Sequence, residues 1–144
     1  MRVPLSIRYF GGLVQYARGL KLQEALVKQR HAGEISDTLL VLQHAPVITV
    51  GKRPTTHNIL AVPEELDRRG VEVHRTERGG DVTWHGPGQI VLYPIVDVRG
   101  LGIGARRYVE GLEDVMISAA AKYGIHAQGR MVGETGVWVG KRKI

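Results

Sequence analysis

The chain has 144 residues, 43% hydrophobic and 24% charged, which is the length and composition of one globular domain. Twenty Lys and Arg against fourteen Asp and Glu give a net charge of +6, but no run of five or more like charges marks a nucleic-acid-binding segment. There is no cysteine, and no apolar stretch reaches the ~18–20 residues that a membrane span needs. We therefore expect a cytoplasmic protein that lacks a secretory signal and binds neither nucleic acid nor membrane.

Hydrophobic periodicity and turn residues predict an α+β chain, with a single domain over residues 1–144. The clearest helix is 105–123, where apolar residues recur at intervals of three, four and one and Gly124 stops the helix. The predicted helices are 12–31, 63–69 and 105–123, and the predicted strands are 6–9, 37–43, 47–50, 71–75, 82–85, 89–98, 125–127 and 136–139. Joining these strands and covering them with two long helices gives a mixed or antiparallel sheet with packed helices.

Residues 78–95 are the most informative segment of the chain. Arg78, Gly79, Gly80 and His85 lie within eight positions, together with a hydroxyl and an indole, and a Pro-Gly turn then leads into an apolar run. Glycines allow backbone N–H groups to approach a ligand, and the cation and the imidazole add side-chain donors. Each of these residues alone also suits an ordinary turn or a core position. Their density favours a loop that binds a small or extended substrate.

A resemblance to the lipoyl (octanoyl) transferase family rests on three ordered segments. The central one is Arg78-Gly79-Gly80-x-x-Thr83-Trp84-His85-x-x-Gly88-Gln89-x-Val91-x-Tyr93, which resembles the family's defining motif. Residues 42–51 are similar to the family's strand–His–Pro–strand segment, and residues 136–144 to the strand that carries its catalytic lysine. The resemblance implies the fold of the biotin and lipoate protein ligase catalytic domain, which is like that of class II aminoacyl-tRNA synthetases.

The resemblance also implies an activity, which is transfer of an octanoyl group from octanoyl-acyl carrier protein to a lysine of lipoyl domains. These domains belong to 2-oxoacid dehydrogenase complexes and the glycine cleavage H protein, and the reaction is the first step of endogenous protein lipoylation. The family uses a cysteine that forms an acyl thioester, assisted by a lysine that matches Lys143. Its cysteine is expected beyond residue 144, so we expect a domain incomplete at the C-terminus and a fragment that forms no acyl-enzyme.

The family motif implies a role for each part of the loop. The backbone of Gly79 and Gly80, with the ring of His85, is expected to line the acyl and carbonyl end of the pocket. Arg78 either orients the loop or meets the phosphopantetheine region of the carrier. The full predicted substrate-binding set is Arg78, Gly79, Gly80, Asp81, Val82, Thr83, Trp84 and His85.

Two strand patterns add expectations about side-chain direction. Thr83 and Trp84 are neighbours on a strand and so face opposite ways, one toward the pocket and the other into the core. Lys141 and Lys143 are expected on one face of a strand, with Arg142 on the other face. The basic surface is expected to steer an acidic acyl carrier protein.

The remaining histidines and the nucleotide-binding patterns favour no cofactor. His44 and His57 are weaker site candidates, while His31, His74 and His126 look structural. No histidine pair has metal-site spacing, and the chain has neither G-x-x-x-x-G-K-[ST] nor G-x-G-x-x-G after a strand. We therefore expect neither a metal nor a cofactor. The alternatives are an ATP-dependent lipoate or biotin ligase on the same fold, and a non-catalytic binding remnant.

Overall fold

The computed structural model describes residues 4–52, 58–131 and 135–144. These residues form both helices and strands, and the predicted α+β class is confirmed. The chain forms two compact units, residues 1–96 and residues 97–144. A single domain over 1–144 stays a prediction. None of the helices in the described ranges combines the length and the apolar character that crossing a membrane requires.

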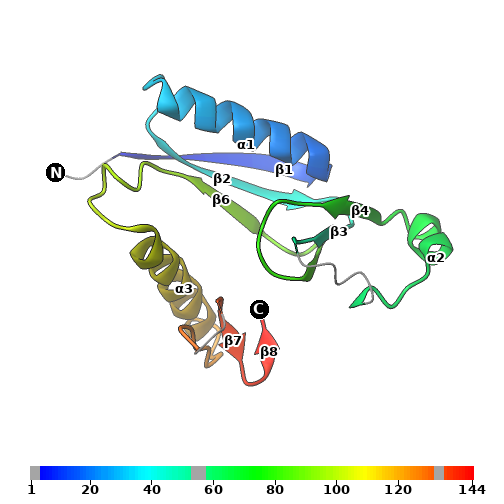
Figure 1. The fold of residues 1–144 in the computed structure, drawn as a ribbon. Helices are drawn as coiled ribbons and strands as arrows, with labels where there is room; N and C mark the ends of the chain where they lie inside the picture. Colours follow the sequence, from blue (N-terminus) through cyan, green and yellow to red (C-terminus); the bar gives the residue numbers. More distant parts are fainter. Residues whose placement is uncertain (1–3, 53–57, 132–134) are drawn as a thin grey trace. The chain divides into compact units, whose positions relative to one another are not determined.

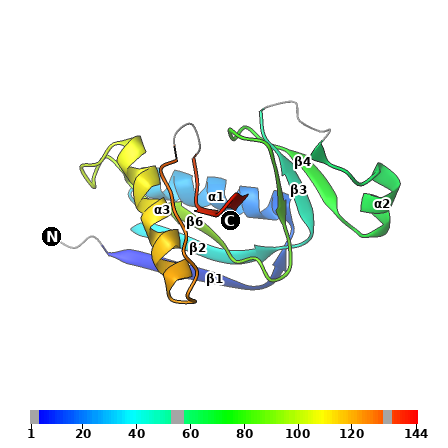
Figure 2. The same cartoon turned by 90° about the horizontal axis from the view of Figure 1, so that it is seen from below.

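A three-stranded mixed sheet with the order β1-β2-β6 begins the first unit (Figure 1). Strand β1 (Leu5–Val14) runs parallel to β2 (Asp37–His44), and β2 pairs antiparallel with β6 (Val91–Ile95). Helix α1 (Tyr16–His31) lies across one face of this sheet (Figures 1 and 2). The buried core between them consists of Val14, Leu26, Leu40, Leu42 and Ile95.

The predicted helix over 12–31 is wrong at its N-terminal end, because α1 begins at Tyr16. Residues up to Val14 pair with β2, with a register shift between Tyr9 and Leu13. Gly12 has a φ of 74°, which a right-handed helix does not accommodate. Strand pairing therefore overrides the helical spacing of the apolar residues before Tyr16.

A second mixed sheet, with the order β4-β3-β5, completes the first unit. Strand β3 (Val47–Val50) follows β2 after Ala45 and Pro46, runs parallel to β4 (Glu72–Arg75) and pairs antiparallel with β5 (Val82–His85). This arrangement places β5 directly beside β3, and β5 is the end of the segment 78–85, which we call the motif loop. The predicted strands 47–50 and 82–85 are confirmed, while 71–75 and 89–98 are shorter in the structure.

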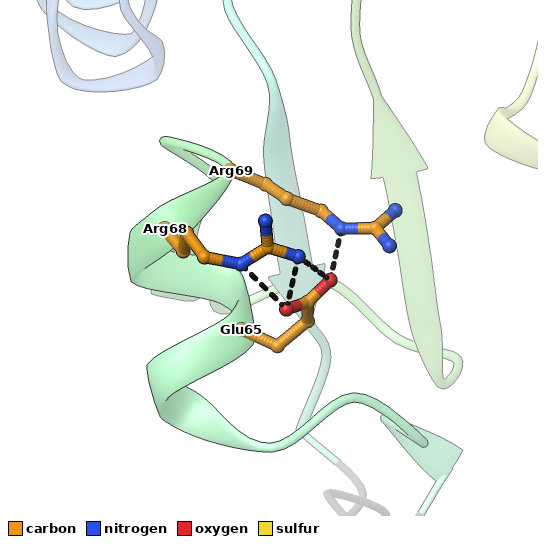
Figure 3. A network of polar contacts seen from close by, with 3 residues as sticks. All are labelled: Glu65, Arg68 and Arg69. Atoms are coloured by element: carbon orange, nitrogen blue, oxygen red, sulfur yellow. Dashed lines mark hydrogen bonds and ion pairs between the residues drawn. The ribbon is translucent and has the colours of Figure 1, made fainter.

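Helix α2 (Pro63–Arg68) has its proline in the first turn, as predicted. Its Glu65 forms ion pairs with Arg68 and Arg69 on the same surface (Figure 3). The guanidinium of Arg68 is the largest cause that lowers the pKa of Glu65 below its ordinary value. Exposed ion pairs at this spacing stabilise a helix only slightly.

The second unit combines helix α3 (Ala105–Ala121) with a hairpin of β7 (Trp138–Val139) and β8 (Arg142–Lys143). The helix ends before Gly124, whose φ is 71°, as the sequence predicted. The predicted strand 125–127 is wrong, because the Ile125 N–H donates to the Ala120 carbonyl as part of the helix terminus. Only Gln128, in the next position, forms a bridge, to Trp138.

Candidate functional site

The bend around Gly79 and Gly80 extends the pairing of β5 with β3 beyond the end of both strands. The Gly51 N–H donates to the Asp81 carbonyl at 3.2 Å, and the Lys52 N–H donates to the Arg78 carbonyl at 3.0 Å. A Cβ at residue 51 would lie 2.3 Å from the carbonyl oxygen of Gly80, so only glycine fits there. Gly80 itself has a φ of 82°, the left-handed region that favours glycine. Two glycines, one in each segment, therefore fix the shape of the bend.

The guanidinium of Arg78 turns back onto β3. Its Nη2 donates to the carbonyl and to the hydroxyl oxygen of Thr49, both at 2.8 Å, and its Nη1 donates to the Gly79 carbonyl at 3.0 Å. Thr49 is fully buried, so the arginine is anchored to the interior of the unit. Of the two roles that the sequence left open, these bonds support the one in which Arg78 orients the loop.

The residues that follow the bend differ in exposure, since Asp81 and Val82 are half-buried whereas Thr83 and Trp84 are exposed. Asp81 accepts a hydrogen bond from the Val82 N–H at 2.7 Å and another from the side chain of Asn58. Thr83 and Trp84 are both exposed, so the expectation that one of them packs into the core is wrong. The Trp84 indole instead lies over the next turn, where a Cβ on residue 86 would come within 2.2 Å of its ring.

His85 lies in a cluster of five rings that connects the motif loop to α1, β2, β4 and β6. The ring of Tyr16 is parallel to that of His85, with centroids 6.5 Å apart, and contacts His44 and His74 at 5.2 Å each. His44 also lies 6.0 Å from His85 and 5.9 Å from Tyr93. Four segments far apart in the sequence thus meet behind the motif loop.

The buried His44 has a defined tautomer. Its Nδ1 lies 2.9 Å from the Val14 carbonyl, which can only accept, so Nδ1 carries the proton. Nε2 then accepts a hydrogen bond from the hydroxyl of Tyr93 at 2.8 Å. Burial lowers the pKa of His44 below its ordinary value, which keeps this ring neutral, and burial raises the pKa of Tyr93 to about 12.

The ring of His44 also depends on a glycine in α1. A Cβ at Gly19 would lie 2.7 Å from Cε1 of His44, a distance that real Cβ contacts do not reach. Gly19 is buried in the first turns of the helix, directly against the imidazole. Glycine has a low helix propensity, but at position 19 a larger residue would collide with the imidazole.

One ring nitrogen of His85 forms a hydrogen bond to a nearby side chain. Its Nδ1 donates to the side-chain oxygen of Gln89 at 2.6 Å, and the amide nitrogen of Gln89 donates to the Trp84 carbonyl at 3.2 Å. In the neutral ring, Nε2 therefore keeps its lone pair for a further partner. This orientation suits a group that accepts or holds a proton at a reaction centre.

His74, which the sequence favoured as structural, joins the ring cluster to an open cleft of about 880 Å³. The walls of the cleft come from α2, the preceding segment and β4, and include Ile59, Leu66 and Val73. Its lining contains no residue of the predicted substrate-binding set. The acyl-binding role of residues 78–85 stays a prediction.

Lys143 belongs to the second unit and lies on β8, opposite Trp138. Its Nζ is 5.9 Å from the centre of the Trp138 ring. The expectation that Lys141 shares a strand face with Lys143 is wrong, because Gly140 and Lys141 form the turn between β7 and β8. Lys143, which matches the lysine of the family motif, thus lies on a strand, whereas Lys141 lies in the turn.

The site residues that sequence reasoning missed are mainly Tyr16, Thr49, Gly51 and Tyr93. Gly51 and Tyr93 stand inside the segments that carry the family resemblance, which could have signalled them, whereas nothing in the local sequence marks Tyr16. His57 lies outside the described residues. Within the described ranges, no group of three or more His, Cys, Asp or Glu could hold a metal ion.

Residues 15–144 match the lipoyl protein ligase A/B catalytic domain family. The chain belongs to this family. Among its curated relatives, the mitochondrial octanoyltransferase LIP2 of Arabidopsis thaliana is 53% identical over 145 residues, covering 100% of this chain and 62% of the relative. The octanoyltransferase of Caldicellulosiruptor saccharolyticus is 51% identical over 133 residues, covering 92% of this chain and 57% of the relative. The predicted resemblance to octanoyltransferases is confirmed.

Solved structures show the same fold at low sequence identity. P. falciparum LipL1 in complex with lipoate superposes with a TM-score of 0.66 at 14% identity, over 97% of this chain and 42% of that one. Lipoate-protein ligase A bound with ATP superposes with a TM-score of 0.57 at 13% identity, over 100% of this chain and 59% of that one. The predicted ligase-type fold is confirmed, and the chain spans only about 54–62% of the length of the octanoyltransferases it matches.

Proposed function

We propose that this chain supplies the acyl-binding part of an octanoyltransferase. The complete enzyme moves an octanoyl group from octanoyl-acyl carrier protein to a lysine of a lipoyl domain. The observation that carries the proposal is the construction of the motif loop, in which Arg78 is anchored to buried Thr49 and Gly51 makes room for the Gly80 carbonyl. A loop ordered before the substrate arrives needs no reorganisation when it binds, which favours catalysis.

The proposed reaction passes through two exchanges. A cysteine outside this chain attacks the carbonyl carbon of the octanoyl thioester, the bond from that carbon to the carrier's sulfur breaks, and the carrier leaves as a thiol. The ε-amine of the acceptor lysine then attacks the new thioester, a C–N bond forms as the bond from the acyl carbon to the cysteine sulfur breaks, and the proton lost by the amine returns to the cysteine. Lys143 holds the proton that moves between these groups, and its cationic form stabilises the thiolate.

The chain's own loop binds the reacting end of the acyl group in this proposal. Backbone N–H groups of Gly79 and Gly80 are the donors for the carbonyl oxygen, and the free lone pair on Nε2 of His85 accepts a proton or a hydrogen bond. Asp81, Val82, Thr83 and Trp84 continue the binding surface along β5. The net charge of +6 favours approach of an acidic acyl carrier protein.

The acceptors are the lipoyl domains of 2-oxoacid dehydrogenase complexes and the glycine cleavage H protein, as the family resemblance implies. The name of the Arabidopsis thaliana relative places that protein in mitochondria, and the expected cytoplasmic location of this chain stays a prediction. No cofactor enters the proposed reaction, which distinguishes it from the ATP-dependent ligase alternative.

A chimera tests the proposal. The residues of the Arabidopsis thaliana relative that follow its matched segment are joined after Ile144, and the product is incubated with octanoyl-acyl carrier protein and an unmodified lipoyl domain. We expect the lipoyl domain to gain one octanoyl group, measured by intact mass, without added ATP. The 144-residue chain alone, which has no cysteine, should gain no octanoyl adduct. An ATP requirement would support the ligase alternative, and binding without transfer would support the non-catalytic one.

Two glycine variants of the chimera locate the acyl site. A Cβ on Gly79 meets no atom within 4 Å, so G79A should fold normally yet narrow the space beside the loop backbone. We expect its kcat/KM to fall by at least about tenfold. The matched control is G11A, also at an exposed glycine with no atom within 4 Å, in β1. Equal activity of the two variants would remove the acyl site from this loop.

A further inference from the structure

A buried carboxylate in α3 holds the backbone that surrounds Lys143. Glu113 is 6% exposed, and its carboxylate bonds to backbone N–H groups rather than to a cationic side chain. Its Oε2 accepts a hydrogen bond from the Arg130 N–H at 3.1 Å, and its Oε1 accepts one from the Gly136 N–H at 2.7 Å. Each carboxylate oxygen therefore holds one backbone amide, that of Arg130 or that of Gly136.

The backbone of Gly129 and Arg130 is shaped around this carboxylate. A Cβ on Gly129 would lie 2.9 Å from Oε2 of Glu113, so the backbone approaches the carboxylate more closely than another residue would allow. Arg130 has a φ of 55°, which is uncommon for a residue other than glycine. Its N–H donates to Glu113 and its guanidinium pairs with Asp114, so two contacts to neighbouring residues of one helix turn hold this conformation.

The same carboxylate determines the space available to the lysine. Gly136 has a φ of 122°, and a Cβ there would lie 2.5 Å from Cε and 3.1 Å from Nζ of Lys143. The lysine chain thus runs across the bare backbone of Gly136. Its Nζ also lies 5.9 Å from the centre of the Trp138 ring. A hydrogen bond from the Ile144 N–H to the Val137 carbonyl, at 2.9 Å, holds the two strands together.

We propose that Glu113 is a positioning residue for Lys143, acting through the backbone of Gly136. The carboxylate holds the Gly136 amide, the glycine leaves a channel for the lysine chain, and Trp138 bounds that channel. A hydrogen bond to a buried charged acceptor is among the stronger ones, so the anchor resists thermal displacement. The consequence for acyl transfer rests on the proposed function, because Lys143 is the proton carrier there.

An NMR experiment on the 144-residue chain tests the placement without any turnover. The Trp138 ring should shift the ε-methylene protons of Lys143 upfield, and the Gly136 amide should exchange slowly with solvent. E113Q replaces one acceptor oxygen by an NH2 group that cannot accept, so we expect loss of the upfield shift and faster exchange at Gly136. The matched control is E110Q, one turn earlier on α3, where the carboxylate pairs with the side chains of Arg106 and Arg107.

A second pair of variants tests the channel directly. G136A places a methyl group in the path of Lys143, whereas G140A adds one at a φ of 58° with no atom within 4 Å. Both residues have positive φ, so both variants carry backbone strain and differ in the contact with the lysine. We expect the upfield shift to disappear in G136A and to persist in G140A. An unchanged Lys143 signal in both E113Q and G136A would overturn the proposal.

Kinetics in the chimera separate this proposal from the proposed function. E113Q should lower kcat by about 10- to 100-fold with little change in KM, since a misplaced proton carrier slows the chemical steps. Full activity of K143A would overturn the role of Lys143 while leaving the NMR result intact. Loss of the NMR signature in E113Q with unchanged kcat would overturn the claim that the placement serves acyl transfer.

Discussion

Two glutamates show how differently the two units use a carboxylate. Glu65, in the first unit, lies at the surface of α2 and is bound by the guanidinium groups of Arg68 and Arg69 (Figure 3). Glu113, in the second unit, is buried and bound by two backbone N–H groups. The partners of Glu65 are flexible side chains, whose hydrogen bonds water can replace. The partners of Glu113 are two backbone N–H groups, for which the carboxylate is the acceptor. We infer that only the buried carboxylate determines local structure.

The largest effect is expected from removing the buried carboxylate. E113A leaves the amides of Arg130 and Gly136 without an acceptor, and each unsatisfied buried donor costs about 1–3 kcal/mol. We therefore expect the free energy of unfolding to fall by about 2–4 kcal/mol, measured by urea denaturation. The control is E110A on the same helix, where a surface ion pair is lost. A similar change in both variants would mean that Glu113 is no different from a surface residue.

Two helix glycines test the same contrast between fixed and free surroundings. G19A in α1 gains helix propensity but drives a methyl group against His44, so we expect a net destabilisation of about 1–2 kcal/mol. G111A in α3 gains the same propensity with no atom within 4 Å of the new Cβ, so it should stabilise by about 0.5–1 kcal/mol. Thermal or urea unfolding measures both. Stabilisation by G19A would show that the His44 ring is free to move.

Much of the first unit could be predicted from its sequence, because local rules dominate there. The strands 47–50 and 82–85 agree with the structure, and Pro63 marks the start of a helix. The start of α1 was missed because the pairing of β1 with β2 spans about thirty residues, and no local pattern shows such pairing. The motif loop was located by its residues, yet its anchor on Thr49 depends on β3 lying beside β5.

The second unit was harder to predict, since its structure depends on long-range contacts to one side chain. Glu113 stands in an apolar stripe whose period predicted the helix, and nothing in that period indicates a buried acceptor. Alternation alone predicts one strand through Lys141 and Lys143, because the pattern does not show the hairpin turn that Gly140 and Lys141 form. Lys143 was identified through the family motif, and its surroundings only through the structure.

The buried imidazole predicts a pH effect of intermediate size. Burial lowers the pKa of His44 below the ordinary 6.5. Between the pKa of the folded chain and 6.5, the unfolded chain therefore binds more protons than the folded one. Stability from this group is complete above pH 6.5 and falls as the pH drops through the window below it. Urea denaturation at pH 7.5 and pH 5.5, about one unit either side of the ordinary value, measures the change.

The control for that pH effect is a ring that is not held by two buried partners. His126, in an exposed position after α3, provides the control variant H126Q. In Y93F the hydroxyl that donates to Nε2 of His44 is lost, and with it the oxygen that would accept from the protonated ring, so protonation becomes more costly and the fall in stability toward low pH should become steeper. Identical pH profiles for the parent and Y93F would contradict the hydrogen bond between Tyr93 and His44.

The smallest effect is expected at the surface carboxylate. R68Q removes the guanidinium that makes three of the hydrogen bonds to Glu65, but water and Arg69 take its place at the surface. We expect the urea midpoint to stay within experimental error of the parent at moderate salt, because screening and side-chain entropy offset an exposed ion pair. The pKa of Glu65 should nevertheless rise toward its ordinary value, since Arg68 is the largest cause of its lowering. A midpoint shift as large as that of E113A would show that a surface ion pair, and not only a buried anchor, determines local structure here.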